Sequence, residues 1–125
     1  MPLNLPRSIE YADGTVRMID QLRLPHELRY IETRDWRRVA EAIRRMEIRG
    51  APLIGVAAAL AMALAILRED EECNRRIGDN GLELIDDGDT VITVCNAGSL
   101  ATSYYGTATA PIYRAVEEGM RVRVL

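Results

Sequence analysis

The chain contains no lysine and no phenylalanine, and it has a single histidine and a single tryptophan. Its 16 positive charges are therefore all arginines, and 19 acidic residues bring the formal net charge to −3. A mildly acidic chain without a clustered basic surface is not expected to bind nucleic-acid backbone independently of sequence. Arginine is the better bidentate ligand for carboxylate and phosphate, but its exclusive use here is explained equally well by genome base composition.

Cysteine is also scarce. Cys73 and Cys95 form neither a disulfide framework nor a zinc-ligand pattern. The first ten residues hold no apolar core long enough for a signal peptide. These two features predict a reducing, cytoplasmic location. There is also no Walker-type phosphate loop and no two-glycine dinucleotide fingerprint in the sequence.

The longest apolar run is residues 51–67, in which seven of the 17 residues are alanine. Pro52 and Gly55 lie near its start. A membrane span needs about 20 strongly apolar residues. We therefore expect a helix buried in a protein core, with a membrane helix as the alternative and no membrane partner in the main interpretation.

A length of 125 residues fits one domain at most. Residues 8–20 have the pattern of a β-hairpin, because apolar residues alternate on both sides of Asp13-Gly14. A third short strand is expected near Tyr30. Residues 1–85 should form a hairpin and a helical region, and residues 86–125 the first strand, helix and strand of a Rossmann-like domain.

A first helix is predicted to begin at a cap on Thr33 or Asp35 and to run to about Glu47. Its core face is predicted from helical spacing to be Trp36, Val39, Ala40, Ile43 and Met46. The alanine-rich helix follows and should end in the charged residues 68–72. A separate helix over about 72–84, punctuated by Gly78 and Gly81, is then expected.

Residues 90–95 form the most clearly predicted strand, because five of the six are β-branched and β-branched residues favour strands. A small polar loop, 96–99, follows it. The next helix is expected to begin near Thr109, since Pro111 is tolerated only in a first turn, and to end before a cap at Gly119. A second strand is expected over 121–125. The predicted fold class is α/β, with the start of a doubly wound parallel sheet.

The loop that begins at Cys95 is the first candidate site. Ligands of open α/β sheets bind at the carboxyl ends of strands, and a helix start that follows would stabilise a thiolate or an anion. Asn96, Ala97 and Gly98 would then line the pocket. The alternative is that Cys95 is a buried, small apolar residue at the end of a strand.

The second candidate is Arg49-Gly50-Ala51, just before Pro52. An arginine beside free helix amides makes a phosphate or carboxylate pocket. The alternative is a helix–helix corner with a solvated arginine. Thr107 is a third candidate as a phosphate donor, although N-capping explains it as well. The single imidazole, His26, is interpreted as a surface or packing residue.

These segments carry a resemblance over nearly the whole chain. The motifs, in order, are Ile9-Glu10-Tyr11, Asp13-Gly14, Asp20-Gln21, Leu24-Pro25, Arg49-Gly50-Ala51-Pro52, Asn74-Arg75, Ile77-Gly78, Asp87-Gly88-Asp89, Cys95-Asn96-Ala97-Gly98 and Gly106-Thr107-Ala108. The chain resembles the methylthioribose-1-phosphate isomerase family, which also includes archaeal ribose-1,5-bisphosphate isomerase and the regulatory subunits of translation initiation factor 2B.

The resemblance implies an aldose–ketose isomerase of methionine salvage that uses neither a metal nor an organic cofactor. It implies that Cys95 acts on the transferring hydrogen together with a later aspartate, and that Arg49, Gly50 and Ala51 bind the sugar phosphate. It also implies a homodimer for the full-length form. The alternatives are a ribose-1,5-bisphosphate isomerase and a non-catalytic regulatory subunit.

The departures from the family are as informative as the match. Between Leu67 and Glu72 the family carries several dozen further residues, which include a second phosphate-binding arginine. After Leu125 it continues with the part that supplies the catalytic aspartate. The chain is therefore interpreted as an internally deleted, C-terminally truncated member, and little or no turnover is expected from these 125 residues alone.

Overall fold

The structure is a computed structural model, and it describes residues 5–125. The chain divides into two compact units, the first ending at Ile66 and the second running from Leu67 to Leu125. The predicted domain boundary between residues 85 and 86 concerns the layout of a larger fold and stays a prediction.

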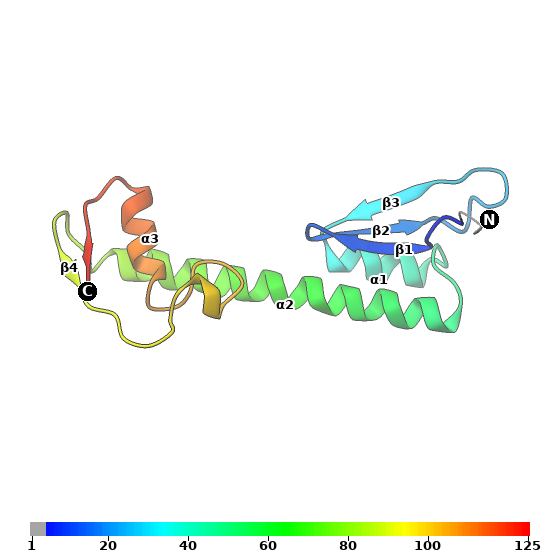
Figure 1. The fold of residues 1–125 in the computed structure, drawn as a ribbon. Coiled ribbons are helices and arrows are strands. Elements are labelled where there is room, and N and C mark those ends of the chain that lie inside the picture. Colours follow the sequence, from blue (N-terminus) through cyan, green and yellow to red (C-terminus); the bar gives the residue numbers. More distant parts are fainter. Residues whose placement is uncertain (1–4) are drawn as a thin grey trace. The chain divides into compact units, whose positions relative to one another are not determined.

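The first unit contains a three-stranded antiparallel sheet (Figure 1). Its strands are β1 (Ile9–Ala12), β2 (Thr15–Ile19) and β3 (Tyr30–Thr33), in the order β1-β2-β3. Asp13 and Gly14 both have positive φ values, 50° and 73°, as the tight turn of a two-residue hairpin requires. The predicted hairpin and the third strand are confirmed.

Helix α1 (Trp36–Arg44) begins after Asp35, whose carboxylate accepts a hydrogen bond from the backbone N–H of Arg37 at 3.0 Å. It ends three residues before the predicted end at Glu47. Met46 lies beyond the helix with a φ of 63° and is exposed, so its predicted place in the core is wrong. The helical spacing no longer applies to a residue that follows the last helical turn.

The core of the first unit lies between β2, α1 and the first half of α2 (Ala51–Leu82). It consists of Val16, Met18, Val39, Ala42, Ile48, Ala57, Ala61 and Leu64. Burying a Val, Leu, Ile or Met side chain contributes about 1.5–3 kcal/mol each. These contacts therefore fix the sheet on its two helices.

Helix α2 contradicts two predictions. It is one continuous helix of 32 residues, where two were expected. Its apolar half is not fully buried either: Val56, Met62 and Ile66 are exposed, and only 17% of its most apolar 18-residue window is buried. By length and composition α2 meets the criterion for a membrane span, as core helices of soluble proteins also do.

The second unit holds a short parallel pair, β4 (Thr90–Val91) and β5 (Arg123–Val124). The strand predicted over 90–95 is thus only two residues long, and Ile92 and Val94 are exposed. A parallel strand is normally buried on both faces between neighbouring strands and helices, and among the described residues β4 pairs with β5 alone.

Helix α3 (Ala110–Glu117) follows the predicted layout. Pro111 occupies its first turn, and Gly119 ends it with a φ of 82°. Helix α3 packs closely on α2 at two glycines of α2. A Cβ on Gly78 would lie 2.7 Å from Cγ of Arg114, and a Cβ on Gly81 would lie 2.8 Å from Cβ of Pro111. The α/β class, with an antiparallel hairpin sheet, helices and a small parallel sheet, is confirmed.

Candidate functional site

Cys95 lies four residues beyond the end of β4, and its thiol side chain is exposed. Its backbone has a φ of 81°, in the left-handed region that residues other than glycine rarely occupy. Such strain persists only where the surroundings hold it, and it is concentrated at functional sites. The alternative of a buried apolar cysteine is therefore wrong, while a catalytic role stays a prediction.

A second stretch of chain holds the Cys95 loop in place. The N–H of Thr107 donates to the carbonyl oxygen of Ala97 at 3.0 Å, and the hydroxyl of Thr109 lies 3.3 Å from the same oxygen. Gly106 has a φ of 79°, and a Cβ there would lie 2.6 Å from the carbonyl carbon of Gly98. The structure thus brings the predicted residues 95–98 and Thr107 together.

Among the described residues, no α-helix begins directly after this loop, and the next helix is α3 at Ala110. Residues 99–101 form a single 3-10 turn, Ser99–Ala101, and Gly98 before it supplies no side-chain cap. A turn of three residues has few aligned peptide dipoles, so it offers little of the positive potential of an α-helix start. Strain and hydrogen bonds, rather than a helix dipole, define the surroundings of Cys95.

Asp70 supports this region and was not predicted to do so. Its carboxylate accepts the N–H of Ser103 at 2.7 Å and an amide N–H of Asn74 at 3.1 Å. Asn74 is almost fully buried. The spacing of four residues between Asp70 and Asn74 on one helix face was the available signal. The partner at Ser103 is a tertiary contact that no local pattern encodes.

A short hydrogen bond joins Tyr105 to Glu117 of α3, with the phenol donating to the carboxylate. This bond raises the pKa of Tyr105, and it lowers the pKa of Glu117. Arg114 adds to the second effect, since it lies 2.5 Å from Glu117 and 2.7 Å from Asp79 of α2. The network fastens the segment after the Cys95 loop to both helices of the second unit.

Arg49, Gly50 and Ala51 lie at the start of α2 in the first unit, as predicted. Gly50 has a φ of 99°, and Ala51 is the first helical residue. Gln21 holds the corner: its carbonyl oxygen accepts from Nη2 of Arg49 at 3.4 Å, and its amide group donates to the Arg49 carbonyl at 3.5 Å. Arg49 is exposed, with donors left for a ligand.

His26 is exposed, in agreement with its interpretation as a surface residue. Within residues 5–125, no three His, Cys, Asp or Glu side chains lie together so as to hold a metal ion. In the first unit the candidate ligand groups are the Arg49 guanidinium and the neighbouring backbone amides, which suit a small anionic ligand. In the second unit the candidate group is the Cys95 thiol.

Residues 56–125 match the profile of the Initiation factor 2 subunit family. This is more than half of the chain, and the chain belongs to that family. Among solved structures, it is similar to the delta subunit of translation initiation factor eIF-2B from A. fulgidus, with 30% sequence identity and a TM-score of 0.51. That match covers 94% of this chain and 53% of the other.

Curated relatives include isomerases. The chain is 38% identical to a putative methylthioribose-1-phosphate isomerase of Methanothermobacter thermautotrophicus, over 95% of this chain and 52% of the relative. It is 37% identical to the methylthioribose-1-phosphate isomerase of Geotalea uraniireducens, over 94% and 53%. The chain therefore spans about half the length of the curated relatives it matches.

The two alignments run over 162 and 183 positions, more than the 125 residues of this chain. The relatives therefore carry residues inside the matched region that this chain lacks. The predicted internal deletion is confirmed in this sense. Its placement between Leu67 and Glu72 stays a prediction.

Proposed function

We propose that this chain is part of an aldose–ketose isomerase that converts 5-methylthioribose 1-phosphate into 5-methylthioribulose 1-phosphate. Membership of the family and the names of the isomerase relatives support this function. The observation that carries it is the exposed Cys95, held at a φ of 81° in a loop at the carboxyl-terminal side of a parallel strand. Within residues 5–125, this is the position at which a thiol is strained and exposed together.

The reaction needs no net oxidant. The hydrogen on carbon 2 of the sugar moves to carbon 1 as the bond from carbon 1 to the ring oxygen opens. The hydroxyl on carbon 2 loses its proton and becomes the carbonyl, and the former ring oxygen gains a proton and becomes a hydroxyl. The phosphate on carbon 1 stays in place throughout. We assign to Cys95 the role of handling the transferring hydrogen, because a cysteine side chain can give a proton as the thiol and accept one as the thiolate.

Arg49 and the backbone of Gly50 and Ala51 are assigned to the binding of the sugar phosphate. The first amides of a helix have no partner within the helix, and they carry a partial positive charge. A guanidinium next to them can bind phosphate through two parallel hydrogen bonds. The hydrogen bonds to Gln21 leave the outer face of Arg49 exposed for such a contact.

Asn96, Ala97, Gly98 and Thr107 are assigned to the lining around the thiol. Ala97 and Thr107 are joined by a backbone hydrogen bond of 3.0 Å, which keeps the lining in one conformation. The partner of this protein is then a small sugar phosphate rather than a nucleic acid or a membrane. We place it in the cytoplasm and, in its full-length form, in a homodimer.

Two alternatives keep the same phosphate chemistry. A ribose-1,5-bisphosphate isomerase would bind a second phosphate in place of the methylthio group. A regulatory subunit would bind a phosphate compound in the same pocket but would not catalyse a reaction. The similarity to an eIF-2B delta subunit supports this second alternative. Calorimetric titration with methylthioribose 1-phosphate, ribose 1,5-bisphosphate and a nucleoside monophosphate separates the three.

The same titration tests the role of Arg49. Arg49→Gln should weaken the binding of methylthioribose 1-phosphate about tenfold or more, as expected for the loss of a charged hydrogen bond. Arg44→Gln is the matched control, because Arg44 is an exposed arginine of α1 that makes no ion pair within residues 5–125, and it should bind like the original chain. Equal affinity in the Arg49→Gln chain would remove this residue from the site.

A further inference from the structure

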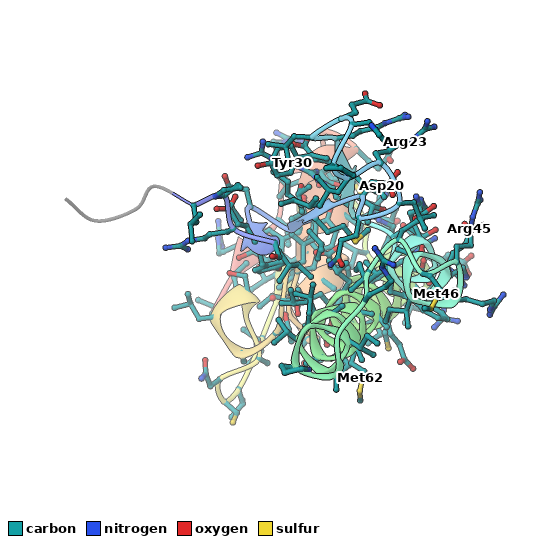
Figure 2. The ribbon with its side chains drawn as sticks, turned by 90° about the vertical axis from the view of Figure 1, so that its right-hand side faces the viewer. Asp20, Arg23, Tyr30, Arg45, Met46 and Met62 are labelled. Atoms are coloured by element: carbon teal, nitrogen blue, oxygen red, sulfur yellow. The ribbon has the colours of Figure 1, made fainter. Side chains whose placement is uncertain are left out.

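A cavity of about 710 Å³ opens in the first unit, and none of the residues assigned above lines it. It is lined by the turn after β2, by β3, by α1 and by the residues just after α1. Four arginines line it: Arg23, Arg29, Arg38 and Arg45. Figure 2 shows Arg23 and Arg45 at the outer surface of this region. The cavity is of the size that holds small-molecule ligands.

The buried carboxylate of Glu47 forms ion pairs with two of these arginines, Arg38 and Arg45. The side chain of Glu47 is only 7% exposed. Its Oε2 lies 2.7 Å from Nη2 of Arg38, and its Oε1 lies 3.5 Å from Nε of Arg45. The negative charge of Glu47 is therefore already balanced by two cations. It orients Arg38 and does not oppose an anion elsewhere in the cavity.

The other two carboxylates of the lining also have partners. Glu32 lies 3.3 Å from Nε of Arg17, whose guanidinium also stacks on the ring of Tyr30 at 3.8 Å. Asp20 is buried and accepts the N–H of Leu22 at 3.1 Å. No carboxylate of the lining is thus free to satisfy the remaining guanidinium donors.

Two guanidinium groups keep unused donors. Nη1 of Arg38 is buried and has no hydrogen-bond partner among the described residues. Arg29 lines the same cavity, and its side chain makes no ion pair with any carboxylate in the described part of the chain. A buried unpaired donor costs about 1–3 kcal/mol, more when it is charged, so a complementary acceptor at this place would be stabilising.

One oxygen of the Glu47 carboxylate, the buried Oε2, is paired with Arg38 by charge but lacks an aligned hydrogen bond. A ligand that places an oxyanion against Arg29 and Arg38 and turns an O–H group towards Glu47 would satisfy all three groups. A phosphate monoester has this chemistry, because it carries close to two negative charges and can retain an O–H or a neighbouring hydroxyl.

We propose that this cavity is a second anion site, in which Arg29 and Arg38 bind the phosphate group of a small phosphate monoester. The unused donors of Arg29 and Arg38 favour a phosphate group, which presents several oxygens around one centre, over a carboxylate. The site lies wholly within the first unit and uses neither Arg49 nor Cys95. Its existence therefore does not depend on the proposed isomerase function.

The test is a titration of the 125-residue chain with inorganic phosphate, followed by NMR at the Nε–Hε resonances of the arginines. The resonances of Arg29 and Arg38 should shift in a saturable way, and that of Arg114 in the second unit should not. Arg29→Gln should weaken this binding about tenfold. Arg29 is exposed and without an ion pair, so the variant should fold.

Three controls separate the outcomes. Arg44→Gln removes an equal charge from α1 outside the cavity and should leave the affinity unchanged. Arg49→Gln should leave the shifts at Arg29 intact, which distinguishes this site from the one proposed at the start of α2. Succinate in place of phosphate should bind more weakly. Unmoved resonances at Arg29 and Arg38, equal weakening by the Arg29 and Arg44 variants, or tighter binding of succinate would overturn the proposal.

Discussion

The N–H of Thr107 donates to the carbonyl oxygen of Ala97 at 3.0 Å, two residues after the strained Cys95. This bond joins the loop that leaves β4 to the segment that enters α3. Gly106, next to Thr107, lies against the same backbone. The conformation of the thiol loop therefore depends on a residue that lies outside it in sequence.

Replacement of Gly106 by alanine should disturb this loop. The new Cβ would lie 2.6 Å from the carbonyl carbon of Gly98 and 2.6 Å from the hydroxyl of Thr109, at a φ of 79°. Gly88→Ala is the matched control, since its φ is 96° and a Cβ there meets nothing within 4 Å. The control should cost only the backbone strain of about 1–2 kcal/mol.

Gly106→Ala should cost more than Gly88→Ala in chemical denaturation, and it alone should change the alkylation rate of Cys95. If the two variants unfold at the same denaturant concentration and leave the thiol equally reactive, the close packing of Gly106 on the loop is not what holds Cys95.

The stability of the second unit should depend on pH through Tyr105 and Glu117. The pKa of Glu117 is lowered by its bond to Tyr105, so this contribution is present above the unfolded pKa of about 4.3 and is lost as pH falls through the lower folded value. The pKa of Tyr105 is raised by the same bond. Its contribution is present below about 10 and is lost as pH rises through the higher folded value.

Tyr105→Phe should therefore flatten both the acid and the alkaline limb of a plot of melting temperature against pH. Tyr104→Phe is the control, because Tyr104 is half exposed and no hydrogen bond of its hydroxyl is present in the described residues. A pH profile that is the same for both variants would contradict the coupling.

Two glycines of α2 should respond to alanine with opposite signs. Gly55 has nothing within 4 Å of a built Cβ, so Gly55→Ala should stabilise the chain by about 0.5–1 kcal/mol through helix propensity. Gly81→Ala should destabilise it, because the Cβ would meet the ring of Pro111, at 2.8 Å from its Cβ. Stabilisation by both changes would mean that α3 does not pack on α2 as described.

A second matched pair tests which face of α2 is buried. Leu64 belongs to the core and is 5% exposed, whereas Met62 is 66% exposed and points away from the helix (Figure 2). Leu64→Ala should cost about 2–5 kcal/mol of unfolding free energy. Met62→Ala should stay within about 0.5 kcal/mol. Similar losses in urea denaturation would show that something covers Met62 in solution.

Local chemistry was sufficient to predict the hairpin, the Asp35 cap, the place of Pro111 in α3 and the cap at Gly119. Each depends on backbone preferences within a few residues, which the sequence states directly. The same is true of the start of α2 at Ala51. The start of α2 is where Arg49 was expected to lie, whereas the strand predicted to end at Cys95 stops at Val91 and only a 3-10 turn follows the loop.

The failures are tertiary in origin. The glycines at 78 and 81 suggested a broken helix, yet they are small because α3 approaches there. The apolar half of α2 suggested full burial, but the described residues cover only the stripe of Ala57, Ala61 and Leu64. A local sequence pattern cannot predict how many elements pack around α2. It also cannot predict the contact of Asp70 with Ser103, which are 33 residues apart.

The most direct test of the central claim is the alkylation of Cys95 with and without methylthioribose 1-phosphate. Cys73 is also exposed and serves as the internal control in the same mass spectrum. With the sugar phosphate at about ten times its Kd, only about a tenth of the chain is free, so Cys95 should react roughly tenfold more slowly while Cys73 is unaffected. An unchanged rate at Cys95 under conditions where the sugar phosphate is bound would contradict its assignment to the substrate site.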